Sequence, residues 1–313
     1  MRMRVVFMGT PDFSVGTLEA IIAAEHEVVG VVTQPDRPKG RGKAMQATPV
    51  KTAALAHDIP VYQPAKVREP EFVETLKNLK PDVIVVVAFG QIIPASILDI
   101  PPLGCINVHA SLLPKYRGAA PIQWAVIDGE KDSGVTIMYM DTGLDTGDML
   151  AKTVVPLEAD ETGGSLFDKL SEAGANLLVE TLIKLELGEV KPEKQPKDSP
   201  NAYARMIKKT DGLIDWNLDA EAIERLIRGM NPWPSAYSYL DGKTLKIWRA
   251  SVCKEETDND PGTVVRTDKN GIYVQTGNGV LRLDEIQLEG KKRMDSNAFL
   301  RGFEVPSGIR LQR

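Results

Sequence analysis

The alternation of apolar runs and helical patterns in residues 4–140 constrains the fold more than any other feature. Short runs rich in β-branched residues occur at 4–9 (RVVFMG), 27–33 (EVVGVVT) and 82–90 (DVIVVVAFG), with segments of helical spacing between them. Such runs are typical of parallel strands that helices cover on both faces. We therefore expect an α/β, Rossmann-like domain with a mostly parallel sheet and a ligand site where its strands end.

The remaining elements of this half follow from the same two patterns. The last expected strand of this half lies at 134–140, and residues 140–150 (MDTGLDTGDML) follow it. The expected helices lie at 13–24, 50–58, 69–79, 121–129 and 165–188, and further strands at 59–64 and 104–110.

A change of composition predicts a domain boundary at residues 189–204. This stretch (EVKPEKQPKDSPNAYA) is polar, carries three prolines and has no periodicity, as in a linker. Beyond it, a short helix at 220–230 precedes alternating strands at 244–252, 262–268, 271–277 and 279–288. We expect a first domain over 1–188 and, over 205–313, a small β-barrel that resembles oligonucleotide-binding folds.

Composition narrows the class of protein. The 313 residues carry a net charge of −5, which argues against a general nucleic-acid binder, although residues 205–313 are slightly basic. No apolar run approaches the roughly 18 residues that span a bilayer, and no signal segment is evident, so a cytoplasmic location is expected. Cys105 and Cys253 are expected to be free thiols, and no residue spacing predicts a metal site.

The end of the first strand argues against a dinucleotide site. Only Gly9 of the three spaced glycines of such a site is present in MGTPDF (8–13). Without the others the backbone cannot approach a pyrophosphate in the usual way.

A basic stretch at 34–45 (QPDRPKGRGKAM) lies between the second strand and the next helix. Glycines keep its backbone adaptable, and its charges are suited to phosphate groups. A phosphate-binding loop and an ordinary solvated loop both fit this composition. Its basic residues are Arg37, Lys39, Arg41 and Lys43.

Asn107 and His109 stand two residues apart in an apolar run, in a chain with only three histidines. On a strand, residues i and i+2 point to the same face, so the amide and the imidazole project together. A carboxylate from the glycine-rich 140–150 segment, which holds Asp141, Asp145 and Asp148, would reach the imidazole and favour its protonated form. An amide, an imidazole and a carboxylate suit acyl transfer without a protein nucleophile, although hydrogen-bonded structural roles remain open.

At this point the sequence resembles the folate-dependent formyltransferases. The resemblance rests on NVHASLLPKYRGAAPIQW (107–124) and MDTGLDTGD (140–148), and it extends through FMGTPDFS, QPDRPKGRGK, VVVAFGQIIP, DGLIDWN and NPWPSAY. It implies a Rossmann-like domain that binds 10-formyltetrahydrofolate as formyl donor, with no metal, and a C-terminal barrel that holds initiator methionyl-tRNA as acceptor. No obligate protein partner is indicated.

The same resemblance assigns residues to roles. Asn107, His109 and Asp145 take the catalytic positions. The implied folate-binding residues are Phe89, Gly90, Gln91, Ile92, Ser111, Leu112, Leu113, Pro114, Asp141, Thr142, Gly143 and Leu144. The tRNA contacts implied by the resemblance are those of the basic loop, Arg37, Lys39, Arg41 and Lys43. In the C-terminal half, charge alone makes other residues candidates for phosphate contacts, and each group also fits an ordinary solvated surface. These candidates are Lys208, Lys209, Lys243, Lys246, Arg249, Lys291, Lys292 and Arg293.

Two other functions fit parts of the sequence. A formyltransferase or hydrolase that acts on a small amine or on water would keep the folate domain, but it needs neither the basic loop nor the barrel. A tRNA-binding protein with an inactive folate site would not need Asn107, His109 and Asp145 together.

Overall fold

The computed structural model describes residues 2–39, 44–255 and 257–312, and the chain divides into two compact units. Two short segments of the first half belong to the second unit, and both are bonded to its helix α7 (Ala220–Gly229). Arg225 Nε donates to the carbonyl of Ile127 at 3.1 Å, and Arg228 Nη1 donates to that of Glu161 at 2.8 Å. The boundaries predicted at 188 and 204 stay a prediction. Unit 1 comprises 1–121, 132–156 and 167–204, and unit 2 comprises 122–131, 157–166 and 205–313.

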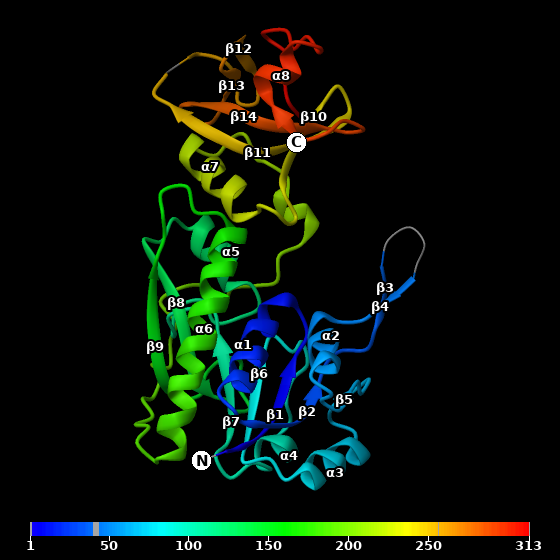
Figure 1. The fold of residues 1–313 in the computed structure, drawn as a ribbon. Helices are drawn as coiled ribbons and strands as arrows, with labels where there is room; N and C mark the ends of the chain where they lie inside the picture. The colour runs from blue at the N-terminus through cyan, green and yellow to red at the C-terminus, as the bar shows by residue number, and fades with distance from the viewer. Residues whose placement is uncertain (1, 40–43, 256, 313) are drawn as a thin grey trace. The chain divides into compact units, whose positions relative to one another are not determined.

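Unit 1 is built on a seven-stranded sheet in the order β5-β2-β1-β6-β7-β8-β9 (Figure 1). The first five strands in this order are parallel, whereas β8 is antiparallel to both of its neighbours, β7 and β9. The expected α/β class with a mostly parallel sheet is confirmed. The strands are β1 (Arg4–Gly9), β2 (Glu27–Val32), β5 (Val61–Tyr62), β6 (Val83–Val87), β7 (Cys105–His109), β8 (Asp132–Tyr139) and β9 (Met149–Pro156).

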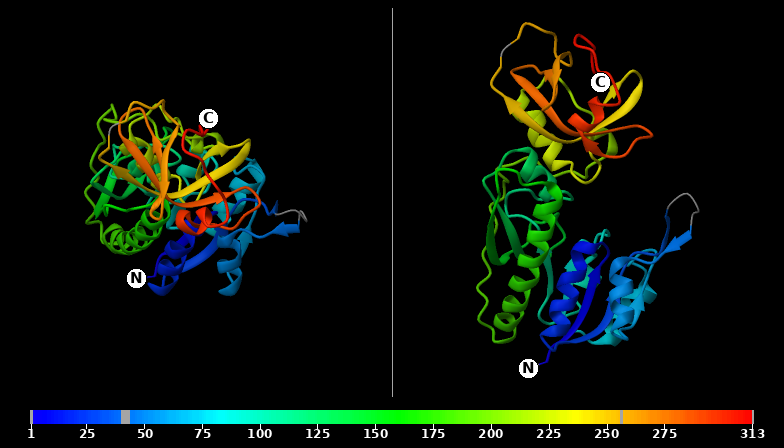
Figure 2. Two further views of the ribbon diagram at one scale, coloured as in Figure 1. Left: turned by 90° about the horizontal axis from the view of Figure 1, so that it is seen from above. Right: turned by 45° about the horizontal axis from the view of Figure 1, so that its top comes forward.

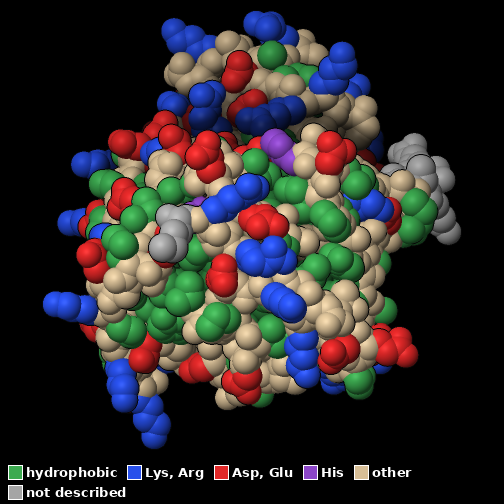
Figure 3. Space-filling model, turned by 60° about the horizontal axis from the view of Figure 1, so that its bottom comes forward, with side chains coloured by type: hydrophobic (Ala, Val, Ile, Leu, Met, Phe, Trp, Pro, Cys, Tyr) green, Lys and Arg blue, Asp and Glu red, His purple; other side chains and the backbone are tan. Residues whose placement is uncertain are grey.

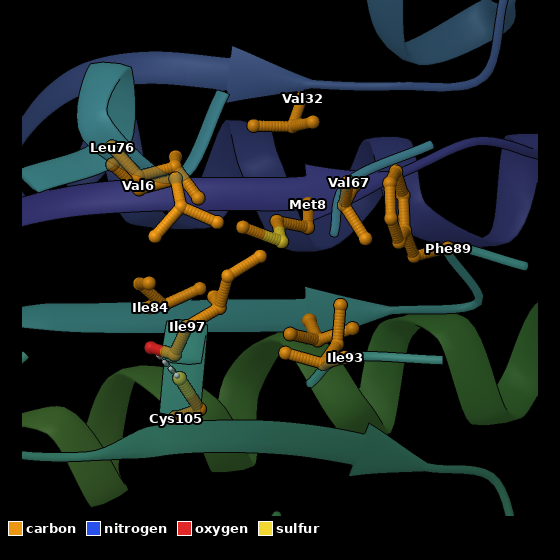
Figure 4. Packing of buried hydrophobic residues seen from close by; sticks show 12 residues of the cluster. Val6, Met8, Val32, Val67, Leu76, Ile84, Phe89, Ile93, Ile97 and Cys105 are labelled. Carbon is orange, nitrogen blue, oxygen red and sulfur yellow. Dashed lines mark hydrogen bonds between the residues drawn. The ribbon is translucent and has the colours of Figure 1, made fainter. Parts of the chain in front are cut away.

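One face of this sheet packs against α3 (Pro70–Leu79) and α4 (Ala95–Leu98). Alternate residues of β1 and β6 point to this side, as the period of two requires, and meet Leu76 of α3 and Ile97 of α4 in a single apolar cluster (Figure 4). The thiol of Cys105 lies in the same cluster, and burial raises its pKa to about 12. Cys105 is therefore a core residue and a poor nucleophile.

The other face carries α1 (Asp12–Ala23), α2 (Pro49–Ala56) and α6 (Gly163–Glu186). The rings of Phe13 and Phe167 meet edge to face at 5.2 Å, and Ser171 Oγ donates to the Phe13 carbonyl at 3.1 Å, so α6 lies beside α1. At Gly174 a β-carbon would stand 2.9 Å from Val108, so a glycine is needed for α6 to approach β7.

Unit 2 holds an antiparallel sheet in the order β10-β11-β14-β13-β12, with β15 paired to β14. Its strands are the yellow to orange arrows in Figure 2. This sheet confirms the predicted C-terminal β domain. Its strands are β10 (Ala236–Leu240), β11 (Lys243–Cys253), β12 (Val264–Asp268), β13 (Gly271–Gln275), β14 (Val280–Leu288) and β15 (Met294–Asp295), and its helices are α5 (Pro121–Ile127), a 3-10 turn (Lys209–Gly212), α7 and α8 (Ser296–Leu300).

The C-terminal segment joins the two edges of this sheet. Gln312 exchanges two main-chain hydrogen bonds with Tyr239 of β10, at 3.0 and 3.1 Å. A few residues earlier, Gly308 N donates to the carbonyl of Val264 in β12, and Val264 N donates to that of Ile309, both at 2.8 Å. Both edges therefore find main-chain partners in one segment, which closes the sheet into a barrel and protects its edges.

The surface charges are mixed. On the face drawn in Figure 3, Lys and Arg side chains are interspersed with Asp and Glu, as the small net charge suggests. Within the part of the chain that the structure describes, no helix has the length and apolar character needed to cross a membrane.

Candidate active site

The end of β7 presents Asn107 and His109. Strand pairing places Asn107 beside Val86 of β6 and Met138 of β8, and His109 beside Thr136 of β8. His109 is buried, with 6% of its surface exposed, and Asn107 is half-buried. Because the two residues alternate with a core valine, they share one face of the strand.

His109 has a partner at each ring nitrogen. Nε2 lies 3.0 Å from the carbonyl oxygen of Tyr116, and since a carbonyl only accepts, Nε2 carries the proton of this bond. Nδ1 lies 3.8 Å from Oδ1 of Asp145, within ion-pair range but too far for a hydrogen bond. The Nδ1 edge of the ring is therefore the one that faces the carboxylate.

Asp145 lies in the connection between β8 and β9, and its carboxylate is held from a second side. Oδ2 accepts a hydrogen bond from the main-chain N–H of Gly118 at 2.8 Å, and the residue has a left-handed φ of 56°. The structure thus brings Asp145 to His109, whereas the expectation that 140–150 follows the last strand was wrong. β9, in which exposed and half-buried residues alternate, is an edge strand that sequence reasoning missed.

Because Gly147 has no side chain, the connection between β8 and β9 can pack closely against β8. A β-carbon at this position would stand 1.8 Å from the carbonyl oxygen of Tyr139. We expect Gly147→Ala to destabilise unit 1 by about 1–3 kcal/mol, the usual cost of overpacking. Gly16→Ala in α1 is the control, since its β-carbon would meet only Ser171 Oγ at 3.4 Å. Urea unfolding of both variants measures the difference, and equal midpoints would contradict the steric argument.

The 111–114 turn is held by its own polar groups. Ser111 Oγ donates to the Lys115 carbonyl at 2.6 Å, and Thr136 Oγ1 donates to the Ser111 carbonyl at 2.7 Å. Ser111 and Leu113 are buried, and Leu113 packs with Met138. Leu112 and Pro114 are half-buried, so they are the members of this set with side-chain surface left for a ligand.

The segment after β6 turns sharply at Ala88 and Gly90, both with positive φ. The carbonyl of Phe89 accepts from Thr10 Oγ1 at 3.0 Å, and the side-chain oxygen of Gln91 accepts from Val67 N at 3.0 Å. These bonds fix the loop and leave the side chain of Ile92 80% exposed, which is unusual for a large apolar residue.

The 141–144 segment is exposed throughout. The Asp141 carboxylate caps the turn, accepting from Gly143 N and Thr146 Oγ1, each at 2.9 Å. Leu144 is 58% exposed at its tip. Both loops assigned to folate by resemblance therefore present large apolar side chains to solvent.

The basic residues fall in three places. Arg37 is exposed on β3 (Arg37–Lys39), which pairs with β4 (Ala44–Gln46), so the flanks of the expected loop form a short hairpin; Arg41 and Lys43 lie outside the described residues. In unit 2, Lys208 and Lys209 are exposed. Also in unit 2, Lys246 Nζ lies over the Trp248 ring at 5.6 Å, with the Arg293 guanidinium at 4.6 Å from the same ring.

Sequence reasoning missed the contribution of the 189–204 segment to this site. Its Tyr203 ring covers Gly118, where a β-carbon would stand 2.9 Å from Tyr203 Cζ and φ is +129°. Burial and the nearby Asp145 carboxylate raise the pKa of Tyr203. Gln195 donates to the Asp145 carbonyl at 2.9 Å. A polar, aperiodic stretch carries no local signal for such contacts.

Among the described residues, no group of three or more His, Cys, Asp or Glu residues is placed to hold a metal ion.

Comparison with known proteins identifies the family to which the chain is related. Residues 1–182 match the model of the formyl transferase family, and residues 206–304 match that of the formyl transferase C-terminal domain. A methionyl-tRNA formyltransferase of Agathobacter rectalis is 62% identical over 307 residues, 98% of either chain, and one of Lachnospira eligens is 58% identical over 314 residues, 99% of either chain.

A solved structure supports the fold. The crystal structure of HypX from Aquifex aeolicus in complex with tetrahydrofolic acid has a TM-score of 0.64 at 20% identity, covering 99% of this chain and 51% of that one. With two family models that together cover most of the chain and relatives above half identity, this chain belongs to the formyl transferase family.

Proposed function

We propose that this chain transfers the formyl group of 10-formyltetrahydrofolate to the α-amino group of methionyl-tRNA. The products are N-formylmethionyl-tRNA, used in translation initiation, and tetrahydrofolate. The observation that carries the proposal is the end-to-end likeness, at 62 and 58% identity, to proteins named methionyl-tRNA formyltransferase. We also propose a cytoplasmic location, where translation takes place.

His109 and Asn107 stabilise the charge that develops during transfer. Attack of the amine on the formyl carbon puts negative charge on the formyl oxygen. Since Nε2 of His109 is bonded to Tyr116, the Nδ1–H of the protonated ring is the donor directed at this oxygen, with the side-chain N–H of Asn107 as the second. Donors aimed at a developing oxyanion act strongly in a buried site.

Asp145 has two tasks in this proposal: it offsets positive charge on the His109 ring, and it passes on the proton that the amine loses. Its carboxylate lies 3.8 Å from Nδ1, where it can offset positive charge that the ring takes up during transfer. The amine loses a proton as its bond to the formyl carbon forms, and N10 of the folate gains one as its own bond to that carbon breaks. Asp145 passes this proton on, directly or through a water molecule. An aminoacyl ester is less basic than an ordinary amine, so no stronger base is required.

The two exposed loops hold the folate. Ile92 and Leu144, 80% and 58% exposed, offer apolar surface for the pterin, while the main chain of 89–92 and 141–144 offers its polar groups. Leu112 and Pro114 complete this wall in the proposal. Ser111 and Leu113 support the wall from beneath, because both are buried.

Transfer of labelled formyl tests the function. With 10-formyltetrahydrofolate as donor, we expect label on charged initiator tRNA and far less on charged elongator tRNA, on a free amino sugar or in formate. Label that passes equally to small amines, or appears as formate, would identify the acceptor as a small amine or water instead.

Removal of two charges tests the tRNA surface. For Lys208→Ala with Lys209→Ala we expect the slope of log K against log salt to fall by about 0.7 to 0.9 for each phosphate that the variant no longer neutralises. Lys66→Ala with Lys77→Ala removes the same charge from exposed positions in unit 1 and serves as control. Filter binding over a salt series measures both, and equal slopes would mean that Lys208 and Lys209 are only solvated.

A further inference from the structure

Residues 193–204, which we call the strap, are bonded along the loops that carry the candidate site. Glu193 and Met149 exchange two main-chain hydrogen bonds at 2.8 Å. Ser199 Oγ donates to the Pro114 carbonyl at 2.7 Å, and the carbonyl of Ala204 accepts from Ala119 N at 2.8 Å. The segment that its composition predicts as a linker is thus attached to unit 1 at both ends.

Gln195 is the residue of the strap that reaches the Asp145 loop. Its Nε2 donates to the carbonyl of Asp145 at 2.9 Å and to that of Gly147 at 2.8 Å. Its Oε1 accepts from Nε and Nη2 of Arg117, at 3.0 and 2.9 Å. A guanidinium only donates and a carbonyl only accepts, so the amide has one possible orientation.

Arg117 anchors this amide. It is 9% exposed, and besides Gln195 it donates to the carbonyls of Pro196 at 2.7 Å and Lys197 at 3.1 Å. Its planar fork therefore holds both the side chain of Gln195 and the main chain that follows it.

These bonds close a ring around Asp145. Arg117 holds Gln195, Gln195 holds the Asp145 main chain, and the Asp145 carboxylate accepts from Gly118, the neighbour of Arg117. Asp145 has φ +56°, a left-handed conformation that is uncommon outside glycine and that hydrogen bonds to neighbouring segments help to hold. The ring supplies those bonds.

We propose that Gln195 and Arg117 are positioning residues that hold the Asp145 carboxylate beside His109. The inference rests on the proposed function, in which Asp145 is catalytic. Gln195 is not assigned a substrate contact, because its amide is fully engaged by Arg117 and by the carbonyls of Asp145 and Gly147, so it acts through the loop that carries Asp145. It therefore changes the rate of the chemical step and leaves substrate affinity alone.

Gln195→Glu is the most specific change. The carboxylate keeps the bonds from Arg117 but places an oxygen without a proton against the two carbonyls at 2.8–2.9 Å. We expect kcat to fall on the order of 10²-fold, as for a misplaced catalytic group. The dissociation constants of tRNA and folate should stay within about twofold, because the affected contacts are not substrate contacts. Gln195→Met, which loses the donors without adding charge, should give a smaller fall and replaces Gln195→Glu if that variant is unstable.

Two comparisons separate positioning from a general structural effect. Gln275→Glu makes the same replacement at an amide of unit 2 that donates to the carbonyls of Thr276 and Gly279, and its kcat should stay within about twofold of the parent. The variant that combines Gln195→Glu with Asp145→Asn should have a kcat no lower than that of Asp145→Asn alone. Both substitutions impair the same function, that of the Asp145 carboxylate.

Other results would overturn the inference. These are an unchanged kcat for Gln195→Glu, a loss confined to substrate affinity, or a double variant slower than Asp145→Asn by the full factor of Gln195→Glu. If Asp145→Asn alone keeps the parental rate, the proposed role of Asp145 fails, and the positioning inference with it. If Asp145→Asn is slow while Gln195→Glu is not, only the positioning inference fails.

Discussion

His109→Ala is expected to lower kcat for formyl transfer by on the order of 10²- to 10³-fold, the usual loss when an oxyanion donor is removed. The ring is buried and its Nε2 is fixed by the Tyr116 carbonyl, so no neighbouring group can take its place without rearrangement. Binding of charged tRNA should remain close to normal, because a side chain with 6% exposure offers little surface to RNA.

Single-turnover transfer of labelled formyl measures the chemical step directly. His57→Ala is the matched control, since His57 also pairs with a carboxylate, Glu19 at 2.8 Å, but lies at the surface. A His109→Ala protein that keeps most of its rate would remove His109 from the chemistry.

Asp145→Asn should be nearly as damaging, with kcat lower by on the order of 10²-fold or more. The amide preserves the shape of the side chain, and its oxygen still accepts from Gly118 N. Its NH₂ group then faces Nδ1 of His109 in place of the carboxylate oxygen. An amide neither offsets positive charge on the ring nor accepts a proton, so both roles proposed for the carboxylate are lost.

Asp82→Asn provides the control for this change. Asp82 is also half-buried, and its Oδ2 accepts a main-chain N–H, that of Arg4 at 2.7 Å, as Asp145 accepts that of Gly118. It is not among the groups assigned to catalysis, so its variant should transfer formyl at a rate within about twofold of the parent. If both variants lost the same share of their transfer rate, the effect of Asp145→Asn would be one of protein stability alone.

The parts of the fold that follow from local pattern were predictable. β1 and β6 are apolar runs that are buried on both faces, and the helices at 13–24, 69–79 and 165–188 appear as α1, α3 and α6 within two residues at each end. β9 and the β3–β4 hairpin were missed because their sequences mix polar and apolar residues at an exposed edge or in a basic loop.

The candidate site likewise combines features that follow from local sequence with features that depend on tertiary contacts. Asn107 and His109 share a face because a strand repeats every two residues, which is a local property that the sequence by itself determined. The approach of Asp145 to His109, the left-handed backbone of Asp145 and the bonds of Gln195 were decided only by tertiary structure. Their partners are main-chain groups and side chains of distant loops, and no periodicity within 189–204 or 140–150 records which distant groups will meet them.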